Sequence, residues 1–438
     1  MQKVSFNSSA NSTAVVIDGV RTPFVKSFGA FAQCDALELF SRVIDGLLRK
    51  SEVDASQIEE VSCGVVIPQT KNPNVARDAV LNLGMPHSVT GYTLNRACTS
   101  SLQTISNAAC TIRSNVANLT IAGGVECLSN VPITYSDKAQ AFLIKLSRAR
   151  TLGQKLALLK TVSFRDWLPT PPALAEPMTG LTMGQHAEIM AKNNDISREQ
   201  QDHFAFGSHK KAYKAQQDGL FKDEIIPVWS ERKIAVAVEQ DDVIRPDASE
   251  EAMAKLKPAF DKKYGTITPA NSSPLTDGAA ACLIGEEKYC VQLGLKPKSR
   301  IVDFCYVAVD PQEGLLIGPA IAIPLILDRN SLKIEDIGLF ELHEAFAAQV
   351  LSCIKCMESS DFNEKHFGRK KPYGTIPREK LNVNGGAIAI GHPFGATGAR
   401  LVTTLGNELQ RRKQRYGLIG VCAAGGMAAA MIIENCQF

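Results

Sequence analysis

Two distant segments of the chain share one order of predicted elements, which indicates an internal duplication. In the first half a strand-like run, an amphipathic helix, a polar link and a second apolar run follow one another over residues 14–20, 37–48, 58–61 and 63–67. In the second half the same order recurs over residues 300–303, 321–327, 334–337 and 339–342. We therefore expect two similar units.

Each half continues as strand, glycine-containing turn, helix and strand. This alternation is typical of a mainly parallel sheet covered by helices, so the fold class is α/β. The predicted domains are an N-terminal half over residues 1–135 with a returning piece at 265–288, and a C-terminal half over residues 289–438. Residues 136–264 lie between them as a separate region.

The intervening region contains a basic, amphipathic stretch from Lys138 to Arg165 that has no acidic residue. Such a stretch can bind an anionic membrane surface, a partner protein or a phosphorylated ligand. The alternative is a solvated helical insertion that packs on its own domain.

Charge and cysteine content exclude several classes of protein. The formal net charge of +3 is too small for binding to nucleic acid driven by counterion release. The 12 cysteines have no framework spacing, which favours a reducing compartment. With no secretory or mitochondrial leader pattern at the N-terminus, we expect a bacterial cytoplasmic protein, or a mitochondrial matrix protein if the source is eukaryotic. The uncharged stretch 417–433 fits two buried strands joined by a glycine turn better than a membrane span.

Cys98 is the first candidate for chemistry. A predicted strand, Gly91 to Leu94, precedes it, and a helical pattern from Leu102 to Ile112 follows it. At such a turn the unpaired amides and the helix dipole can stabilise a thiolate or an oxyanion. The alternative is a small buried core cysteine.

Two histidines follow predicted strands, where α/β enzymes collect catalytic groups. His343 is expected to open a helix over residues 344–348, and His392 lies in a glycine-rich loop, residues 384–398. The glycine spacing there does not match a dinucleotide fingerprint. His203 and His209, in a polar helical stretch, are predicted to lie at the surface.

Two further cysteine patterns are weaker. Cys422 ends a predicted strand and by itself fits a core residue. Cys353 and Cys356 have CxxC spacing, but no second pair follows, so a structural role is favoured over a zinc or thioredoxin-like role.

Four blocks of residues occur in the order and spacing of the thiolase family, and the resemblance extends along nearly the whole chain. The blocks are Cys98-Thr99-Ser100, His343-Glu344-Ala345-Phe346, Asn384 through Gly398, and Cys422 through Met427. The chain most resembles the branch that forms the thiolase subunit of the fatty-acid oxidation trifunctional complex, since that branch has His before Glu-Ala-Phe and a long basic insertion.

The resemblance implies two αβαβα halves that form a five-layered core, with an inserted loop domain over residues 136–264. It also implies cleavage of a 3-ketoacyl-CoA by CoA. Cys98 would accept the acyl group, His392 would activate it, and Cys422 would exchange a proton with the acetyl-CoA carbanion. This division fits the chemistry, because carbon–carbon cleavage needs a soft nucleophile and a separate proton donor.

By the same resemblance, His343 would serve one oxyanion site with His392, and the backbone amides of Cys98 and Ala424 would form the other. The residue at 424 is commonly Gly in the family, so its backbone angle must suit a side chain with Cβ. Coenzyme A would be a substrate rather than a cofactor, with no metal. Its predicted contacts are Thr182, Met183, Arg245, Ser273 and Phe346. The expected partners are a second copy of the chain and a hydratase/dehydrogenase alpha subunit, with peripheral membrane contact through residues 138–165.

Three other functions remain open at this point. A ketoacyl synthase shares the duplicated fold but lacks a second catalytic cysteine, so Cys422 argues against it. A biosynthetic acetoacetyl-CoA thiolase would differ in chain length preference, and a non-catalytic scaffold would anchor a complex through residues 138–165.

Overall fold

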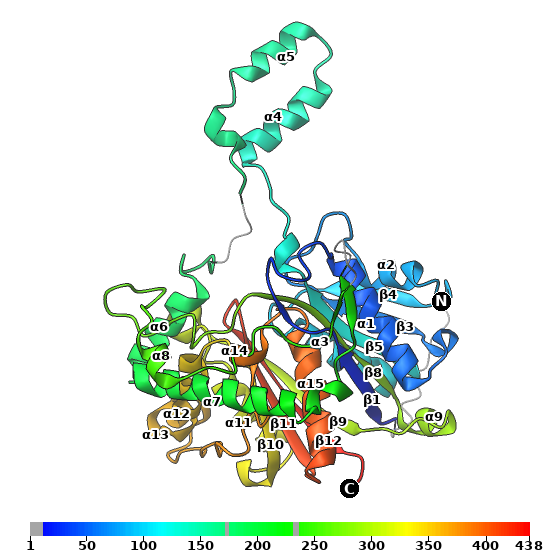
Figure 1. Cartoon of the computed structure of the whole chain (residues 1–438), viewed down its shortest axis with the longest axis vertical. Helices are drawn as coiled ribbons and strands as arrows, with labels where there is room; N and C mark the ends of the chain where they lie inside the picture. The colour runs from blue at the N-terminus through cyan, green and yellow to red at the C-terminus, as the bar shows by residue number, and fades with distance from the viewer. Residues whose placement is uncertain (1–11, 171–174, 231–235) are drawn as a thin grey trace.

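A ten-stranded sheet forms the centre of the computed structural model, which describes residues 12–170, 175–230 and 236–438 (Figure 1). The strands of this sheet run in the order β10-β11-β12-β9-β1-β8-β5-β3-β4, and the short β2 pairs with β8. Their bounds are β1 Ala14–Arg21, β2 Val25–Lys26, β3 Glu60–Gly64, β4 Thr90–Leu94, β5 Leu119–Glu126, β8 Thr276–Glu286, β9 Ser299–Ala308, β10 Ile337–Leu342, β11 Tyr416–Ala423 and β12 Met427–Asn435.

The strand order confirms the duplication. In the N-terminal half β1 neighbours β8, β8 neighbours β5, and β5 runs parallel to β3. In the C-terminal half β9, β12, β11 and β10 repeat these relations in the same order and orientation. On the side away from β5, β3 pairs with the parallel strand β4. In the second half, the position equivalent to β4 is occupied only by a single parallel bridge from Phe340 of β10 to Leu381. The half-sheets join where β1 pairs with β9.

Alternate residues of the strands face different cores, which produces the layers. On β8, Ala281 and Leu283 face an outer core under α1 (Ala36–Ser51) and α2 (Val75–Asn82). Cys282 and Ile284 face a middle core with α3 (Ser100–Arg113) and α15 (Thr397–Arg411). A third core lies between β10 to β12 and the helices α11 (Pro319–Arg329) and α12 (Ala347–Glu358). The result is the five-layered α/β architecture, with α3 and α15 between the half-sheets.

The turn between β11 and β12 shows how the sequence fixes a local structure. Gly425 and Gly426 both have left-handed φ angles, 76° and 68°, which only glycine adopts without strain. The stretch 417–433 is therefore two buried strands joined by a glycine turn, as predicted. None of the helices in the described parts of the chain is long and apolar enough to cross a bilayer.

The intervening region contains a helical hairpin that projects from the body of the molecule (Figure 1). It consists of α4 (Asp137–Arg148) and α5 (Leu152–Leu159), which pack on each other, and α4 also packs on η3 (Phe164–Trp167). The alternative that this insertion packs on its own domain is wrong, because the hairpin extends away from the body. Its apolar side chains Leu152, Leu156 and Leu159 are exposed.

The remaining helices of the intervening region pack on the body. They are α6 (Met183–Asn193), α7 (Arg198–Gln217) and α8 (Glu250–Ala254), and α6 and α7 both contact α12. The strands β6 (Val228–Ser230) and β7 (Val236–Val238) form a separate two-stranded sheet. The predicted division into residues 1–135 with 265–288, 136–264 and 289–438 stays a prediction.

Two local predictions are wrong. The helix after His343 begins at Ala347 rather than Glu344, because Glu344 and Ala345 bond to other segments of the chain instead of continuing a helix. His209 is buried at 3% exposure, since α7 turns that face toward the body. His203, on the same helix, is exposed as predicted and contacts Glu250.

Candidate active site

Cys98 lies in the tight turn between β4 and α3. Ala97, directly before it, has a left-handed φ of 47°, an uncommon and strained conformation for a residue with Cβ. The turn is closed by the amides of Thr99 and Ser100, which donate to the carbonyl oxygens of Arg96 at 3.1 Å and Ala97 at 3.0 Å. This turn fixes the position of the Cys98 sulfur just before the first turn of α3.

His392 lies directly beside Cys98, with its Nε2 3.3 Å from Sγ of Cys98. Nδ1 of His392 lies 2.6 Å from Oγ1 of Thr397, and that hydroxyl donates to the carbonyl oxygen of Pro393 at 3.1 Å. Because a carbonyl only accepts, the Thr397 oxygen must accept from Nδ1–H. Nε2 therefore carries the lone pair and can accept the thiol proton of Cys98.

Burial keeps both members of this pair neutral. It raises the pKa of the Cys98 thiol to about 12. It lowers the pKa of His392 to about 3, with a smaller contribution from the cation of Arg400. A charged pair would be costly in this dry environment. The resting state is thus a thiol and a neutral imidazole, already aligned for proton transfer.

The backbone amides of Ala424 and of Cys98 itself favour the thiolate of Cys98, which partly offsets the effect of burial on its pKa. Ala424 is not among the residues with positive φ, so a side chain with Cβ fits there. The amide of the next residue, Gly425, donates to the buried carboxylate of Glu176 at 3.0 Å, which holds this turn in place.

His343 lies against His392, with ring centroids 4.0 Å apart. It is fully buried, and neither ring nitrogen has a hydrogen-bond partner within the described residues. Burial, with the neighbouring His392 and Arg400, lowers the pKa of His343 well below its ordinary value. A neutral buried imidazole with a free donor can hydrogen-bond a substrate oxygen.

Cys422, the third residue predicted to take part in the chemistry, is buried near the end of β11. Burial raises the pKa of Cys422 well above its ordinary value, and a negative charge on Cys98 would raise it further. Cys422 is thus a protonated thiol. The two halves of the chain meet at the contact between Cys98 and His392.

Four of the five residues predicted to contact CoA belong to segments that meet beside His343 and His392. Ser273 donates its amide to the carbonyl oxygen of Ala345 at 3.0 Å, next to Phe346. The ring of Phe346 packs edge to face on Phe260 at 6.1 Å. A Cβ on Gly184 would overlap the Phe260 ring, so the start of α6, with Thr182 and Met183, also lies at this wall.

Arg245 lies on a separate loop against α7. Its amide donates to Nδ1 of His209 at 3.3 Å. Its exposed guanidinium forms no ion pair in the described parts of the chain.

Two polar residues at the site were not identified from the sequence. Thr397 fixes the tautomer of His392, and its only sequence signal was a hydroxyl five residues after a candidate histidine. Glu126, at the end of β5, accepts from the amides of Val66 at 3.1 Å and Gly395 at 3.0 Å. Burial raises the pKa of Glu126 to about 7. A carboxylate ending an apolar strand was the signal for it.

The CxxC pair lies within α12, where Cys353 donates to backbone carbonyls and Cys356 contacts Asn194. Across residues 12–170, 175–230 and 236–438, the structure contains no group of three or more His, Cys, Asp or Glu side chains that could hold a metal ion.

Comparisons with known proteins agree with this geometry. The thiolase N-terminal domain matches residues 14–288, and the thiolase C-terminal domain matches residues 295–435. The chain is similar to a 3-ketoacyl-CoA thiolase of Photobacterium profundum, with 43% identity over 96% of each chain. It is 41% identical to a 3-ketoacyl-CoA thiolase of Vibrio cholerae, over 99% of this chain and 100% of the relative. The crystal structure of the Bacillus anthracis acetyl-CoA acetyltransferase superposes with a TM-score of 0.82 and 34% identity, covering 97% of this chain and 99% of that one.

Proposed function

The chain belongs to the thiolase family, and from this premise we propose that it is a 3-ketoacyl-CoA thiolase, an acetyl-CoA C-acyltransferase of fatty-acid β-oxidation. It would cleave a 3-ketoacyl-CoA with CoA to acetyl-CoA and an acyl-CoA shortened by two carbons. The observation that carries the proposal is the 3.3 Å contact between Cys98 Sγ and His392 Nε2.

In the first half-reaction the Cys98 proton moves to Nε2 of His392, and the sulfur attacks the 3-keto carbon. The resulting oxyanion would be stabilised by the backbone amides of Cys98 and Ala424, the two amides that lower the pKa of the Cys98 thiol. The bond between C2 and C3 then breaks. C2 takes the proton of Cys422, acetyl-CoA leaves, and the acyl group remains on Cys98 as a thioester.

The enolate oxygen of the departing acetyl-CoA needs its own donors. His392, now protonated, and the neutral His343 lie side by side and supply them. In the second half-reaction the thiol of CoA gives its proton to the Cys422 thiolate and attacks the acyl thioester. The Cys98 thiolate leaves and recovers its proton from His392, which restores the starting state.

Coenzyme A enters as a substrate, and no other cofactor takes part in these steps. We propose that Thr182, Met183, Ser273 and Phe346 contact its pantetheine arm. Arg245 would pair with a phosphate, since its guanidinium has no ion-pair partner in the described parts of the chain.

The proposed assembly is a homodimer that also binds a hydratase/dehydrogenase alpha subunit. The α4–α5 hairpin would contact the surface of an anionic membrane, because it carries basic side chains beside exposed Leu152, Leu156 and Leu159. We place the enzyme in a bacterial cytoplasm, or in the mitochondrial matrix if the source is eukaryotic.

The assay that tests this function measures acetyl-CoA release from a series of 3-ketoacyl-CoA substrates of increasing chain length. We expect medium or long chains to be preferred, and Cys98→Ala to abolish turnover. Absence of acetyl-CoA from every substrate would leave the non-catalytic scaffold as the better explanation.

A second candidate function is that of a biosynthetic acetoacetyl-CoA thiolase. It is favoured by the structural likeness to the Bacillus anthracis acetyl-CoA acetyltransferase. A strict preference for acetoacetyl-CoA in the same assay would select it.

The division of roles between the two sulfurs predicts the behaviour of Cys422→Ser. Acyl transfer to Cys98 should remain detectable by mass spectrometry. Condensation of two acetyl-CoA molecules should fall by about 10²–10⁴-fold, the usual contribution of an acid–base group. Equal loss of both reactions would contradict this division.

A further inference from the structure

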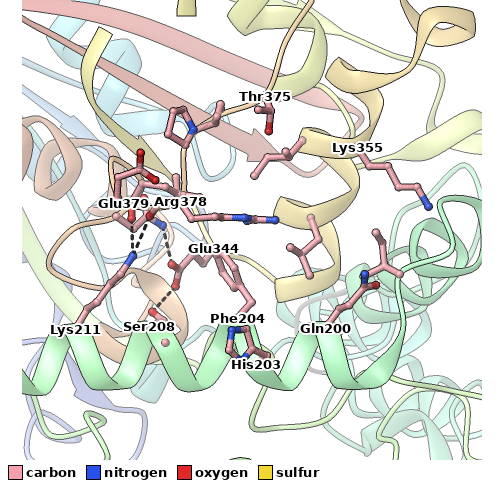
Figure 2. A pocket seen from close by; sticks show the side chains of 18 of the residues that line it. Gln200, His203, Phe204, Ser208, Lys211, Glu344, Lys355, Thr375, Arg378 and Glu379 are labelled. Carbon is pink, nitrogen blue, oxygen red and sulfur yellow. Dashed lines mark hydrogen bonds between the residues drawn. The ribbon is translucent and has the colours of Figure 1, made fainter. Parts of the chain in front are cut away.

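A cavity of about 830 Å³ lies outside the catalytic site, between α7, α12 and the segment 375–382 (Figure 2). Neither Cys98 nor His392 lines it. Its volume lies in the range of pockets for small organic ligands. The floor is apolar and buried, and it consists of Ile196, Leu351, Ile354, Ile376 and Leu381.

The side chain of Arg378 extends across this cavity near Phe204 (Figure 2). Its guanidinium carbon lies 5.7 Å from the centroid of the Phe204 ring. Within the described residues the guanidinium has no hydrogen bond or ion pair, and Arg378 is accessible to solvent. An arginine that is held on an aromatic ring with its donors free is suited to bidentate binding of an anion.

Several of the other polar groups of the cavity already have partners. Lys211 donates to the carbonyl oxygen of Leu381 at 2.8 Å, and Lys355 donates to that of Asn194 at 2.7 Å. Glu344 accepts from Ser208 at 2.7 Å, as a dashed line in Figure 2 shows, and from Asn382 at 2.6 Å. Glu358 and Glu379 are exposed at the rim. Among these three cations, Arg378 is therefore the one whose hydrogen-bond donors are available to a ligand.

We propose that this cavity is a second ligand site, which binds an amphipathic carboxylic acid. Arg378 holds the carboxylate, and the apolar floor covers the hydrocarbon part. The floor excludes a purely polar anion as the preferred ligand, because such an anion would leave the apolar side chains unused.

The site is placed to affect the reaction. Glu344 forms part of the wall of the cavity and directly follows His343 in the chain. The Glu344 carboxylate also accepts from the amide of Ile388, in the glycine-rich loop that carries His392. A ligand at Arg378 would thus lie in the same cavity as Glu344, the residue that follows His343 and contacts the loop that carries His392.

The probe is octanoate, titrated calorimetrically into the full-length protein. We expect saturable binding, which Arg378→Met weakens by at least about tenfold because the charged hydrogen bonds are lost. Arg49→Met, on the exposed face of α1, is the matched control and should bind as the wild type does. Octanol, which has no charge, should bind at least about tenfold more weakly than octanoate.

A second variant tests the cavity without removing the cation. Gly207 on α7 lines the cavity, and a Cβ there would meet nothing within 4 Å. Gly207→Phe should therefore fill the cavity and abolish binding, whereas Gly207→Ala should preserve it and keep the helix intact.

Alkylation of Cys98 separates this site from the catalytic one, and octanoate binding should survive it. The proposal is overturned if the wild type shows no saturable binding, if Arg378→Met and Gly207→Phe both bind normally, or if alkylation of Cys98 abolishes binding. Because none of these measurements depends on turnover, their failure is distinct from failure of the thiolase assay.

Discussion

At the scale of single residues, the proposed nucleophile Cys98 would be activated by its alignment with His392 rather than by a standing charge. Cys98 and His392 are neutral at rest, and the proton needs to move only along the 3.3 Å contact between them. A stable thiolate would require a nearby cation or a wetter site. The thiolate should therefore form only when a substrate carbonyl can accept the sulfur.

This neutrality predicts the pH dependence of Cys98 alkylation. With the thiol pKa raised to about 12, the thiolate fraction grows with pH throughout the range in which proteins are stable. The rate of iodoacetamide alkylation, followed by mass spectrometry, should rise steadily between about pH 7 and 10. Because the pKa of His392 is lowered to about 3, no step should appear near pH 6.5. A plateau at neutral pH would instead indicate a thiolate–imidazolium pair.

Thr397 gives a second prediction at this scale. Thr397→Val keeps the shape of the side chain but removes the acceptor for Nδ1–H of His392. An unpaired buried donor costs about 1–3 kcal/mol, so kcat/KM should fall by roughly 10–100-fold as the ring loses its tautomer and position. Thr397→Ser retains the hydroxyl and should stay within a few-fold of the wild type. Unchanged activity in the valine variant would show that Thr397 does not orient His392.

At the scale of elements, the loop that carries His392 is seated by close backbone contacts. A Cβ on Gly395 would overlap the carbonyl oxygens of Gly64 and Val125 at the ends of β3 and β5. Gly124 approaches Gly395 in the same way. Glu126 accepts the Gly395 amide, so this corner has both a steric and a polar constraint. The loop from the second half is thereby fixed onto the strand ends of the first.

Gly395→Ala should therefore displace the His392 loop. We expect a loss of about 1–3 kcal/mol in the free energy of unfolding, measured with denaturant, together with a large loss of thiolysis. Gly153→Ala, where a Cβ would meet nothing within 4 Å, is the control and should be neutral or slightly stabilising. Normal stability and activity in Gly395→Ala would mean that the loop can shift without consequence.

At the scale of the whole molecule, the α4–α5 hairpin is an appendage to a body with its own cores. None of the large hydrophobic cores of the described residues includes a side chain from α4 or α5. The two ends of the hairpin are paired, since the amide of Thr134 donates to Thr170 at 3.0 Å and that of Thr170 donates back at 2.8 Å. The insertion can thus be removed without separating these ends.

Replacing residues 135–169 with Asn-Gly should give a folded enzyme, because such a pair closes a two-residue hairpin. The melting temperature and the activity on soluble substrates should change little. Co-sedimentation with vesicles of phosphatidylcholine and phosphatidylglycerol should be lost, as should its dependence on salt. Vesicle binding that survives the deletion would place the membrane contact elsewhere.

The sequence by itself determined the duplication, the alternation of strands and helices, and the positions of Cys98, His392 and Cys422 after strand patterns. These features are local, since apolar periodicity and glycine turns are set by neighbouring residues. Only the tertiary structure decided the start of the helix at Ala347 and the burial of His209, because contacts with distant segments override local propensity. The same is true of the contacts of Thr397 and Glu126, the projection of the hairpin, and the Arg378 guanidinium, which has no ion pair among the described residues. All of these depend on which residues remote in the sequence come together in the folded chain.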